Sequence, residues 1–246
     1  MLIGRYYEKK LLATIAAVCL SLTACNSTEQ TKDVQANEKK DKNTEQQTAT
    51  TSPKAKEIKE KSAVERLSQD HSVSLEGDGA NSSDFFELKS GFVIAEVEHT
   101  GESNAILELK DEQGNDSGSL SNFIGNGKEK RVVLLNKSGK YFINPMADGH
   151  WKVNMSQSIP IDKVVTAPGT ISGHGSDVVF VKLEKGLKEL HGVHKNGESN
   201  FVVDLNDSMI FNEIGAADTT KKVPVKENGI HIFTIQADGD WTIEVK

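Results

Sequence analysis

The chain is poor in cysteine and aromatic residues, has no run long enough to be a membrane-spanning helix, and has no excess of positive charge. Its two cysteines are Cys19 and Cys25, and aromatic residues make up 6% of its 246 residues. The apolar run Leu11–Leu22 is well short of the ~20 residues that a bilayer-crossing helix needs. Lysine and arginine total 29 against 36 aspartates and glutamates. Proteins that bind nucleic acid need clustered positive charge, so this balance argues against that class.

The N-terminus has the pattern of a secretion signal. Arg5, Lys9 and Lys10 precede the apolar run, and small residues follow it. The run ends in Leu22-Thr23-Ala24-Cys25, which resembles the lipobox of bacterial lipoproteins. The resemblance implies that residues 1–24 are a lipoprotein signal peptide and that Cys25 is lipidated. The cysteine would carry diacylglycerol and a fatty acid such as palmitate on the new amine, which anchors the chain to the extracytoplasmic face of the cell membrane. An ordinary signal peptide that happens to contain a cysteine is the alternative.

Removal of the signal would leave Cys25 as the single cysteine. Cys19 lies within the predicted signal, and the Cys25 sulfur would carry lipid. The mature chain would then have no disulfide and no free thiol for catalysis or zinc binding. The folded part must therefore be held by its own hydrophobic cores.

Residues 25–70 read as a lipid-anchored, disordered tether. From Asn26 to about Asp70 the sequence is mostly Lys, Glu, Gln, Thr, Asn and Ser, which cannot bury enough apolar surface to offset the entropy of ordering. Within it, the segment from Lys54 to Leu67 contains helix-forming residues, and we expect at most a short helix there. The tether is not expected to pack on the folded part.

The remaining sequence contains an internal repeat, with residues 71–156 as module 1, 157–169 as a joint and 170–246 as module 2. The second copy carries one extra residue near His194 and loses six after Leu205. The only two tryptophans fall at the same place in each copy. The matches that set this register are Gly77 with Gly173, Gly79 with Gly175, Phe85 with Phe180, His99 with His194, Asn122 with Asn212, and the Ala-Asp-Gly-x-Trp segments 147–151 and 237–241.

Each copy has the pattern of antiparallel strands. Apolar residues alternate with polar ones from Trp151 to Met155 and from Trp241 to Val245, which is the period of a half-buried strand. Further expected strands lie at 85–88, 92–97, 105–109, 131–135 and 139–143, and at 178–183, 187–193, 201–205, 223–225 and 229–233. We therefore predict an all-β chain with two tandem antiparallel β-sandwich modules, jelly-roll-like, after the tether. Pro160 and Pro168 argue against regular strand pairing in the joint.

The repeated string G-x-G…F-x-L…H-x-G-x-S-N-F…A-D-G-x-W resembles a β-module of bacterial and archaeal exported proteins. The resemblance covers residues 72–153 and 170–246, and the first copy departs from it where Ala105 replaces the phenylalanine found at Phe201. That module has no assigned activity, so the resemblance implies a fold and no chemistry.

Two kinds of metal site have candidate residues, and a structural role fits each set better. Asp148 and Asp238 could serve calcium, but Ala-Asp-Gly is turn chemistry, in which the aspartate bonds locally, and no acidic pair is common to both copies. His99 and His194, with His174 and His191, could serve zinc, yet residues three apart in a strand, as 191 and 194 are, face opposite sides. We predict no metal and no cofactor.

The best polar clusters that both copies share are the turns Glu102-Ser103-Asn104 and Glu198-Ser199-Asn200. They are weak binding candidates whose first expected role is hydrogen bonding to local backbone. No Gly-x-Ser-x-Gly motif is present, although paired carboxylates could meet in the folded chain. We predict a membrane-anchored protein without enzymatic activity that binds an envelope or extracellular partner, or has a structural role, at the cell envelope. An envelope-acting hydrolase and a protective lipoprotein that blocks phage or toxin entry are the alternatives.

Overall fold

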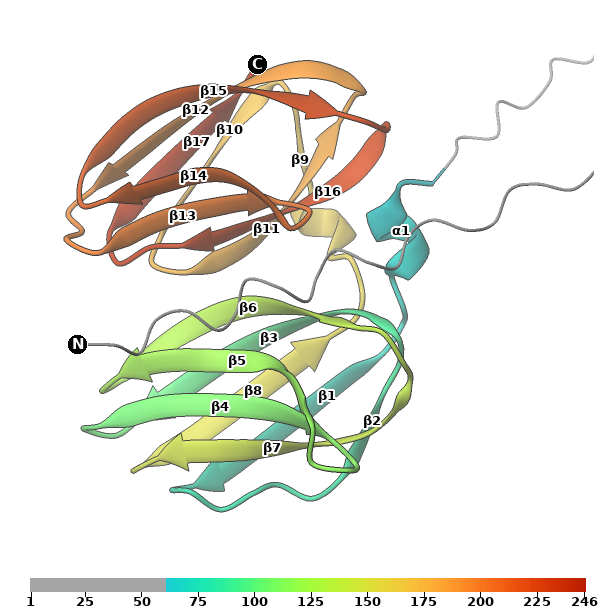
Figure 1. Cartoon of the computed structure of the whole chain (residues 1–246), viewed down its shortest axis with the longest axis vertical. Coiled ribbons are helices and arrows are strands. Elements are labelled where there is room, and N and C mark those ends of the chain that lie inside the picture. Colours follow the sequence, from blue (N-terminus) through green and yellow to red (C-terminus); the bar gives the residue numbers. More distant parts are fainter. Residues whose placement is uncertain (1–60) are drawn as a thin grey trace, which may run out of the picture. The chain divides into compact units, whose positions relative to one another are not determined.

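The computed structural model describes residues 61–246, so the predicted signal, Cys25 and most of the predicted tether lie outside the described residues. Within 61–246, the only helical elements are the five-residue helix α1 (Ala63–Leu67) and the short 3-10 helix η1 (Ile161–Lys163); all other regular elements are strands (Figure 1). No helix in this range is long and apolar enough to cross a membrane. The prediction of an all-β chain is confirmed.

The first copy of the repeat forms two four-stranded antiparallel sheets. One sheet has the order β1-β8-β3-β6 and the other β2-β7-β4-β5. The strands are β1 (Ser72–Asp78), β2 (Phe86–Leu88), β3 (Gly91–Thr100), β4 (Asn104–Asp111), β5 (Asp116–Ile124), β6 (Gly127–Leu135), β7 (Gly139–Ala147) and β8 (His150–Ser156).

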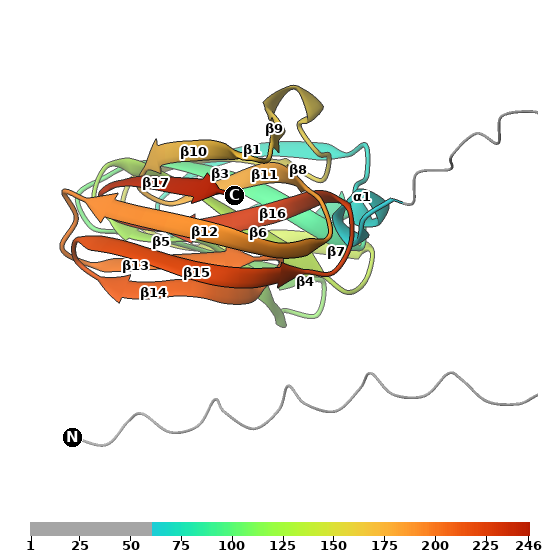
Figure 2. The ribbon, with the colours of Figure 1, turned by 90° about the horizontal axis from the view of Figure 1, so that it is seen from above.

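The second copy repeats this arrangement. Its sheets have the orders β10-β17-β12-β15 and β14-β13-β16-β11-β9, and Figure 2 shows β10, β17, β12 and β15 side by side. The strands are β9 (Val165–Thr166), β10 (Gly169–His174), β11 (Asp177–Leu183), β12 (Gly186–Lys195), β13 (Asn200–Leu205), β14 (Ser208–Ile214), β15 (Ala217–Val225), β16 (Gly229–Gln236) and β17 (Asp240–Val245).

Both copies have the strand order of a jelly roll. When the eight strands of a copy are counted in chain order, without the two-residue β9, its sheets run first-eighth-third-sixth and second-seventh-fourth-fifth. Two sheets with this order form the double-sheet jelly roll. Each pair of sheets encloses one core, which contains Trp151, Tyr141 and Leu107 in the first copy and Trp241, Phe201 and Phe233 in the second. The predicted jelly-roll-like β-sandwich is therefore what the chain forms.

The glycines of the Gly-x-Gly segments make room for the two tryptophans. Trp151 is 1% exposed, and its Nε1 donates to the carbonyl oxygen of Gly79 at 3.2 Å. A Cβ on Gly77 would lie 2.8 Å from the Cε2 of this indole, closer than real contacts allow. The second copy repeats the device, because Trp241 donates to Gly175 and its ring lies against Gly173. The repeated glycines and tryptophans are thus one packing unit.

The end of the predicted tether is packed, which corrects the expectation that residues up to 70 stay apart from the folded chain. Ser62 and Glu65 form a capping box at the start of α1. The Ser62 hydroxyl also donates to the carbonyl oxygen of Ile230 at 2.8 Å, and Val64 is 6% exposed. One buried valine and a satisfied cap hold this short helix in place. The mostly polar composition of the segment gives no sign of this packing.

Val64 belongs to a third apolar cluster, which joins the two sandwiches and the joint. Phe92 of β3 packs against Phe180 of β11 with ring centroids 5.9 Å apart, and Ile159 of the joint is buried among them. The joint itself is ordered. Its first residue, Gln157, is fully buried and bonds to the backbone of Lys89. The expectation that the joint avoids strand pairing was wrong at β9, which pairs in parallel with β11.

Candidate functional site at the loop end of each sandwich

Three connections meet at one end of each sandwich, and an aspartate ties two of them together. In the first copy, Asp148 of the β7–β8 turn accepts hydrogen bonds through Oδ2 from the backbone N–H groups of Glu102 at 2.9 Å and Ser103 at 3.0 Å. Asp238 does the same for Glu198 and Ser199, both at 2.9 Å. Each aspartate also accepts a hydrogen bond from its own backbone amide, as expected of the turn. Beyond the turn, the aspartates hold a loop 39 to 46 residues away in sequence, which local turn chemistry could not reveal.

The same hydrogen bonds fix the charge of the two aspartates. The amide hydrogen bond from Glu102, with that from Ser103, lowers the pKa of Asp148 below its ordinary value. The amides of Glu198 and Ser199 lower the pKa of Asp238 in the same way. Bonding to the charged form favours it, so both carboxylates are ionised at neutral pH.

A buried histidine lies behind each aspartate. His99 is 3% exposed, and its Nδ1 lies 2.8 Å from the carbonyl oxygen of Gly125, so Nδ1 carries the proton of this bond. Its Nε2 lies 3.5 Å from Oδ1 of Asp148 and has no hydrogen-bond partner among the described residues. His194 repeats this geometry with Gly215 and Asp238. These histidines join the β3–β4 loop to the neighbouring turns, which agrees with the structural role expected from the sequence.

The other candidate metal ligands do not gather. Nε2 of His191 lies 2.8 Å from Asp218, whereas His194 is buried on the other side of β12. Within residues 61–246 no group of three or more His, Cys, Asp or Glu side chains lies close enough to hold a metal ion.

Sequence reasoning missed a reciprocal exchange at the strand ends. Asp78 of β1 faces His150 of β8 with Oδ1 to Nδ1 at 3.0 Å. In the second copy the two residue types change places, and His174 of β10 faces Asp240 of β17 at 2.9 Å. The sequence does carry a signal for this exchange. The middle residue of the Gly-x-Gly segment and the residue before the tryptophan are an aspartate and a histidine in one copy, and a histidine and an aspartate in the other.

The predicted binding candidates are exposed at this loop end. The side chains of Glu102, Ser103 and Asn104, and of their counterparts Glu198, Ser199 and Asn200, make no hydrogen bond with other described residues. The expectation that these side chains bond local backbone was wrong, since their backbone amides do the bonding. Beside them, Ile124 is 76% exposed and Ile214 is 78% exposed. The sequence analysis did not single out these isoleucines, although they match in the repeat.

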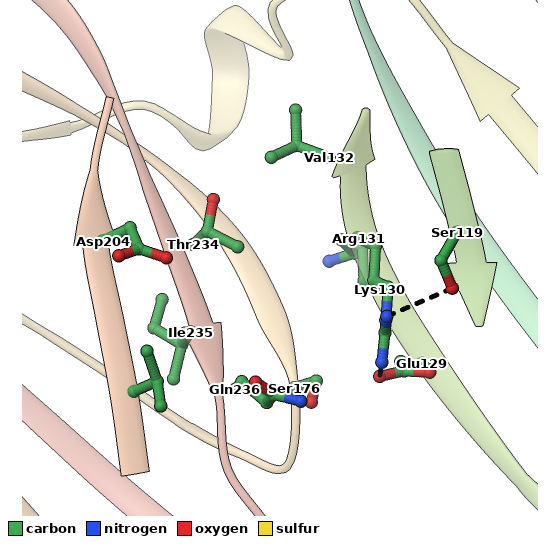
Figure 3. A pocket seen from close by; sticks show the side chains of 11 residues that line it. Ser119, Glu129, Lys130, Arg131, Val132, Ser176, Asp204, Thr234, Ile235 and Gln236 are labelled. Carbon is green, nitrogen blue, oxygen red and sulfur yellow. Dashed lines mark hydrogen bonds and ion pairs between the residues drawn. The ribbon is translucent and has the colours of Figure 1, made fainter. Parts of the chain in front are cut away.

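The described residues also form a small charged cleft. It has a volume of about 190 Å³ and is lined from β5, β6, β13, β16 and the β10–β11 loop (Figure 3). Glu129 and Arg131 form an ion pair at 2.8 Å, and Arg131 also donates to Ser119 at 3.3 Å. Burial, with Asp207 nearby, raises the pKa of Asp204. This volume is below the ~300 Å³ at which small-molecule sites begin, so the cleft offers little room for a ligand.

No protein-family model matches the sequence, and no curated protein matches it. Among solved structures, the chain matches one described as "The Triple Jelly Roll Fold and Turret Assembly in an Archaeal Virus", with 13% identity and a TM-score of 0.25. The alignment covers 73% of this chain and 52% of the viral one, so the chain spans about half the length of that protein.

Proposed function

We propose that this chain is a membrane-anchored extracytoplasmic lipoprotein that binds a partner at the cell envelope through the loop ends of its two sandwiches. The anchor is inferred from Leu22-Thr23-Ala24-Cys25 after a short apolar run. The binding role is inferred from the loop ends, where both copies keep the same exposed side chains.

The carboxylates at the loop ends favour binding over hydrolysis. Asp148 and Asp238 are each occupied by two backbone amides. A general acid or base must reach a substrate proton, and these groups instead hold a loop in place. A fixed loop presents its exposed side chains in a defined arrangement, which suits recognition.

Two like surfaces on one chain can act together. Once one copy has bound a partner with repeated epitopes, binding of the second is effectively intramolecular. The apolar cluster around Phe92 and Phe180 supports this action, because it limits the positions that the copies can sample. Two weak contacts, one at each loop end, would then give a high overall affinity.

The anchor is tested with two cysteine variants of the full chain. Cys25→Ser should abolish labelling by radioactive fatty acid and release the protein from the membrane fraction. Cys19→Ser is the matched control, because that residue lies within the predicted signal, and it should label and fractionate as the parent does. If Cys25→Ser still labels and stays with membranes, the chain is not a lipoprotein.

A further inference from the structure

The two copies of the repeat provide a comparison within one chain. In the register of the repeat, six pairs of positions hold the same residue and are exposed in both copies. In the first copy these positions lie in the β3–β4 loop, at the start of β4, on the edge strand β5 or in the β7–β8 turn, and those of the second copy are their counterparts. The pairs are Glu102 and Glu198, Ser103 and Ser199, Asn104 and Asn200, Asn122 and Asn212, Ile124 and Ile214, and Asp148 and Asp238.

Among these side chains, only those of the aspartates bond to another part of the fold, because they bind loop amides. The remaining five pairs are named here the shared patch. The cores, by contrast, have diverged. Ala105 stands where the second copy has Phe201, and Phe201 stacks between His194 and Phe211. The fold has tolerated such exchanges in its interior, whereas these exposed side chains at the loop end are the same in both copies. Recognition of one ligand by both copies would account for this.

The shared patch is one continuous surface in each copy. Asn104 of β4 pairs directly with Ile124 of β5, and Asn200 of β13 pairs directly with Ile214 of β14. Directly paired residues project their side chains to the same face of a sheet. Asn122 lies two residues before Ile124 and therefore on the same face. An amide pair and an aliphatic side chain thus lie side by side, next to the Glu102 loop.

Acidic groups lie beside the patch in each copy. Glu102 is exposed, and the ionised Asp148 lies directly behind its backbone. The second copy has Glu198 and Asp238 in the same places, and the whole chain has a net charge of −7. Nucleic acid and anionic lipid are repelled by such a surface. A complementary ligand has a positive group beside an apolar one, with polar groups that the asparagine amides can bond.

We propose that the shared patch of each copy binds a protein segment that presents a lysine or arginine beside an aliphatic side chain. The exposed isoleucine takes the aliphatic contact, the glutamate takes the basic side chain, and the asparagines bond to the segment's backbone. This inference rests on the proposed binding function and names its ligand class. Because both copies carry the patch, the chain holds a partner with repeated segments of this kind more firmly than a partner with one.

The test uses the full chain and a synthetic peptide of alternating lysine and leucine, coupled at several copies to one scaffold. We expect binding that weakens as salt is raised. Changing both isoleucines (Ile124→Ser with Ile214→Ser) should weaken binding at least tenfold, and so should changing both glutamates (Glu102→Gln with Glu198→Gln). A change in one copy alone should leave an intermediate affinity, because one contact remains.

Matched controls lie outside the patch. Ile161 is 69% exposed and has no counterpart in the repeat, so Ile161→Ser should bind as the parent does. The exposed Glu112 lies in the loop that the second copy lacks, and Glu112→Gln should also have no effect. Thermal unfolding of every variant should match the parent, since all these side chains are exposed.

Several results would overturn the proposal. One is that the patch variants bind the lysine–leucine peptide as tightly as the parent does. Another is that the parent binds a glutamate–leucine peptide as tightly as the lysine–leucine peptide. A third is that the parent prefers neutral glycan polymers or phosphatidylcholine vesicles to the lysine–leucine peptide. If patch-dependent binding to one of those other probes is found, the envelope-binding function stands and the ligand class fails. If none of the probes, the peptide included, binds in a way that depends on the patch, the binding role of the loop ends fails with it.

Discussion

Replacing Gly77 with alanine should destabilise the first sandwich through a clash with one ring. A Cβ at Gly77 would lie 2.8 Å from Cε2 of Trp151, and that indole is 1% exposed and cannot swing aside. Forcing an extra methyl group into a filled core costs roughly 1–3 kcal/mol. For a domain of this size, each 1 kcal/mol lowers the melting temperature by roughly 4–8 °C. Calorimetry of the full chain should therefore show a loss of about 5–20 °C in the transition of the first sandwich.

Two further variants test whether the loss of stability in Gly77→Ala comes from the clash with the Trp151 indole. Gly139→Ala adds a methyl group where no atom lies within 4 Å, so it should be neutral or stabilise by about 0.4–1 kcal/mol through the unfolded state. Trp151→Leu should by itself cost up to the ~3–5 kcal/mol of a full truncation. In that background, however, Gly77→Ala should cost almost nothing, which is non-additivity between touching residues. The second copy offers a replicate, since a Cβ at Gly173 would lie 2.9 Å from Cε2 of Trp241. If Gly77→Ala behaves like Gly139→Ala, the account of the Gly-x-Gly segments is wrong.

Three other predictions concern the helix, a histidine and the loop aspartates. Ser62→Ala removes the cap of α1 and its bond to Ile230, and it should lower the free energy of unfolding by about 1 kcal/mol; an unchanged melting temperature would show that the helix is not docked. Burial lowers the pKa of His231, so protonation favours the unfolded state, and stability should fall as the pH drops below about 6.5. The variant His231→Asn should lose this pH dependence. If the pH dependence persists in the variant, another group is responsible for it. Asp148→Asn should speed hydrogen exchange at the amides of Glu102 and Ser103 and leave distant amides unchanged. Unchanged exchange at these two amides would show that Asp148 does not hold the loop. Because the folded pKa of Asp148 is lowered, its contribution should be complete above pH ~4 and lost as the pH falls through the folded value.

The repeat and the period-two pattern were enough to predict the fold. The alternation after Trp151 and Trp241 placed β8 and β17 correctly, and most other expected strands lie within the observed ones. Five strands were not foreseen: β1, β5, β10, β14 and the two-residue β9. The first copy's pair reads Ser-Val-Ser-Leu-Glu-Gly-Asp and Asp-Ser-Gly-Ser-Leu-Ser-Asn-Phe-Ile. Such strands are edge strands, which pair on one side only, so their sequences carry little apolar signal.

The candidate site was predicted in part, and the missing part depends on contacts distant in sequence. The turn at Glu102 was found because both copies keep it. The partner of its amides could not be predicted. Asp148 lies in an Ala-Asp-Gly turn, where an aspartate is expected for local reasons, so its bond to the distant loop leaves no separate signal in the sequence. Ile124 was passed over because β5, the strand that carries it, was not foreseen, and its place beside Asn104 follows only from the pairing of β4 with β5. The docking of α1 through Val64 depends on a pocket made by both copies, which no local pattern encodes.

The mass of the N-terminal fragment of the protein, taken from the membranes of its own host, tests the proposed anchor most directly. After proteolysis and organic extraction, we expect a fragment whose first residue is Cys25, with diacylglycerol on its sulfur and a fatty acid on its amine. A fragment with an unmodified Cys25, or one that begins at any other residue, would contradict the proposal that this chain is a lipoprotein.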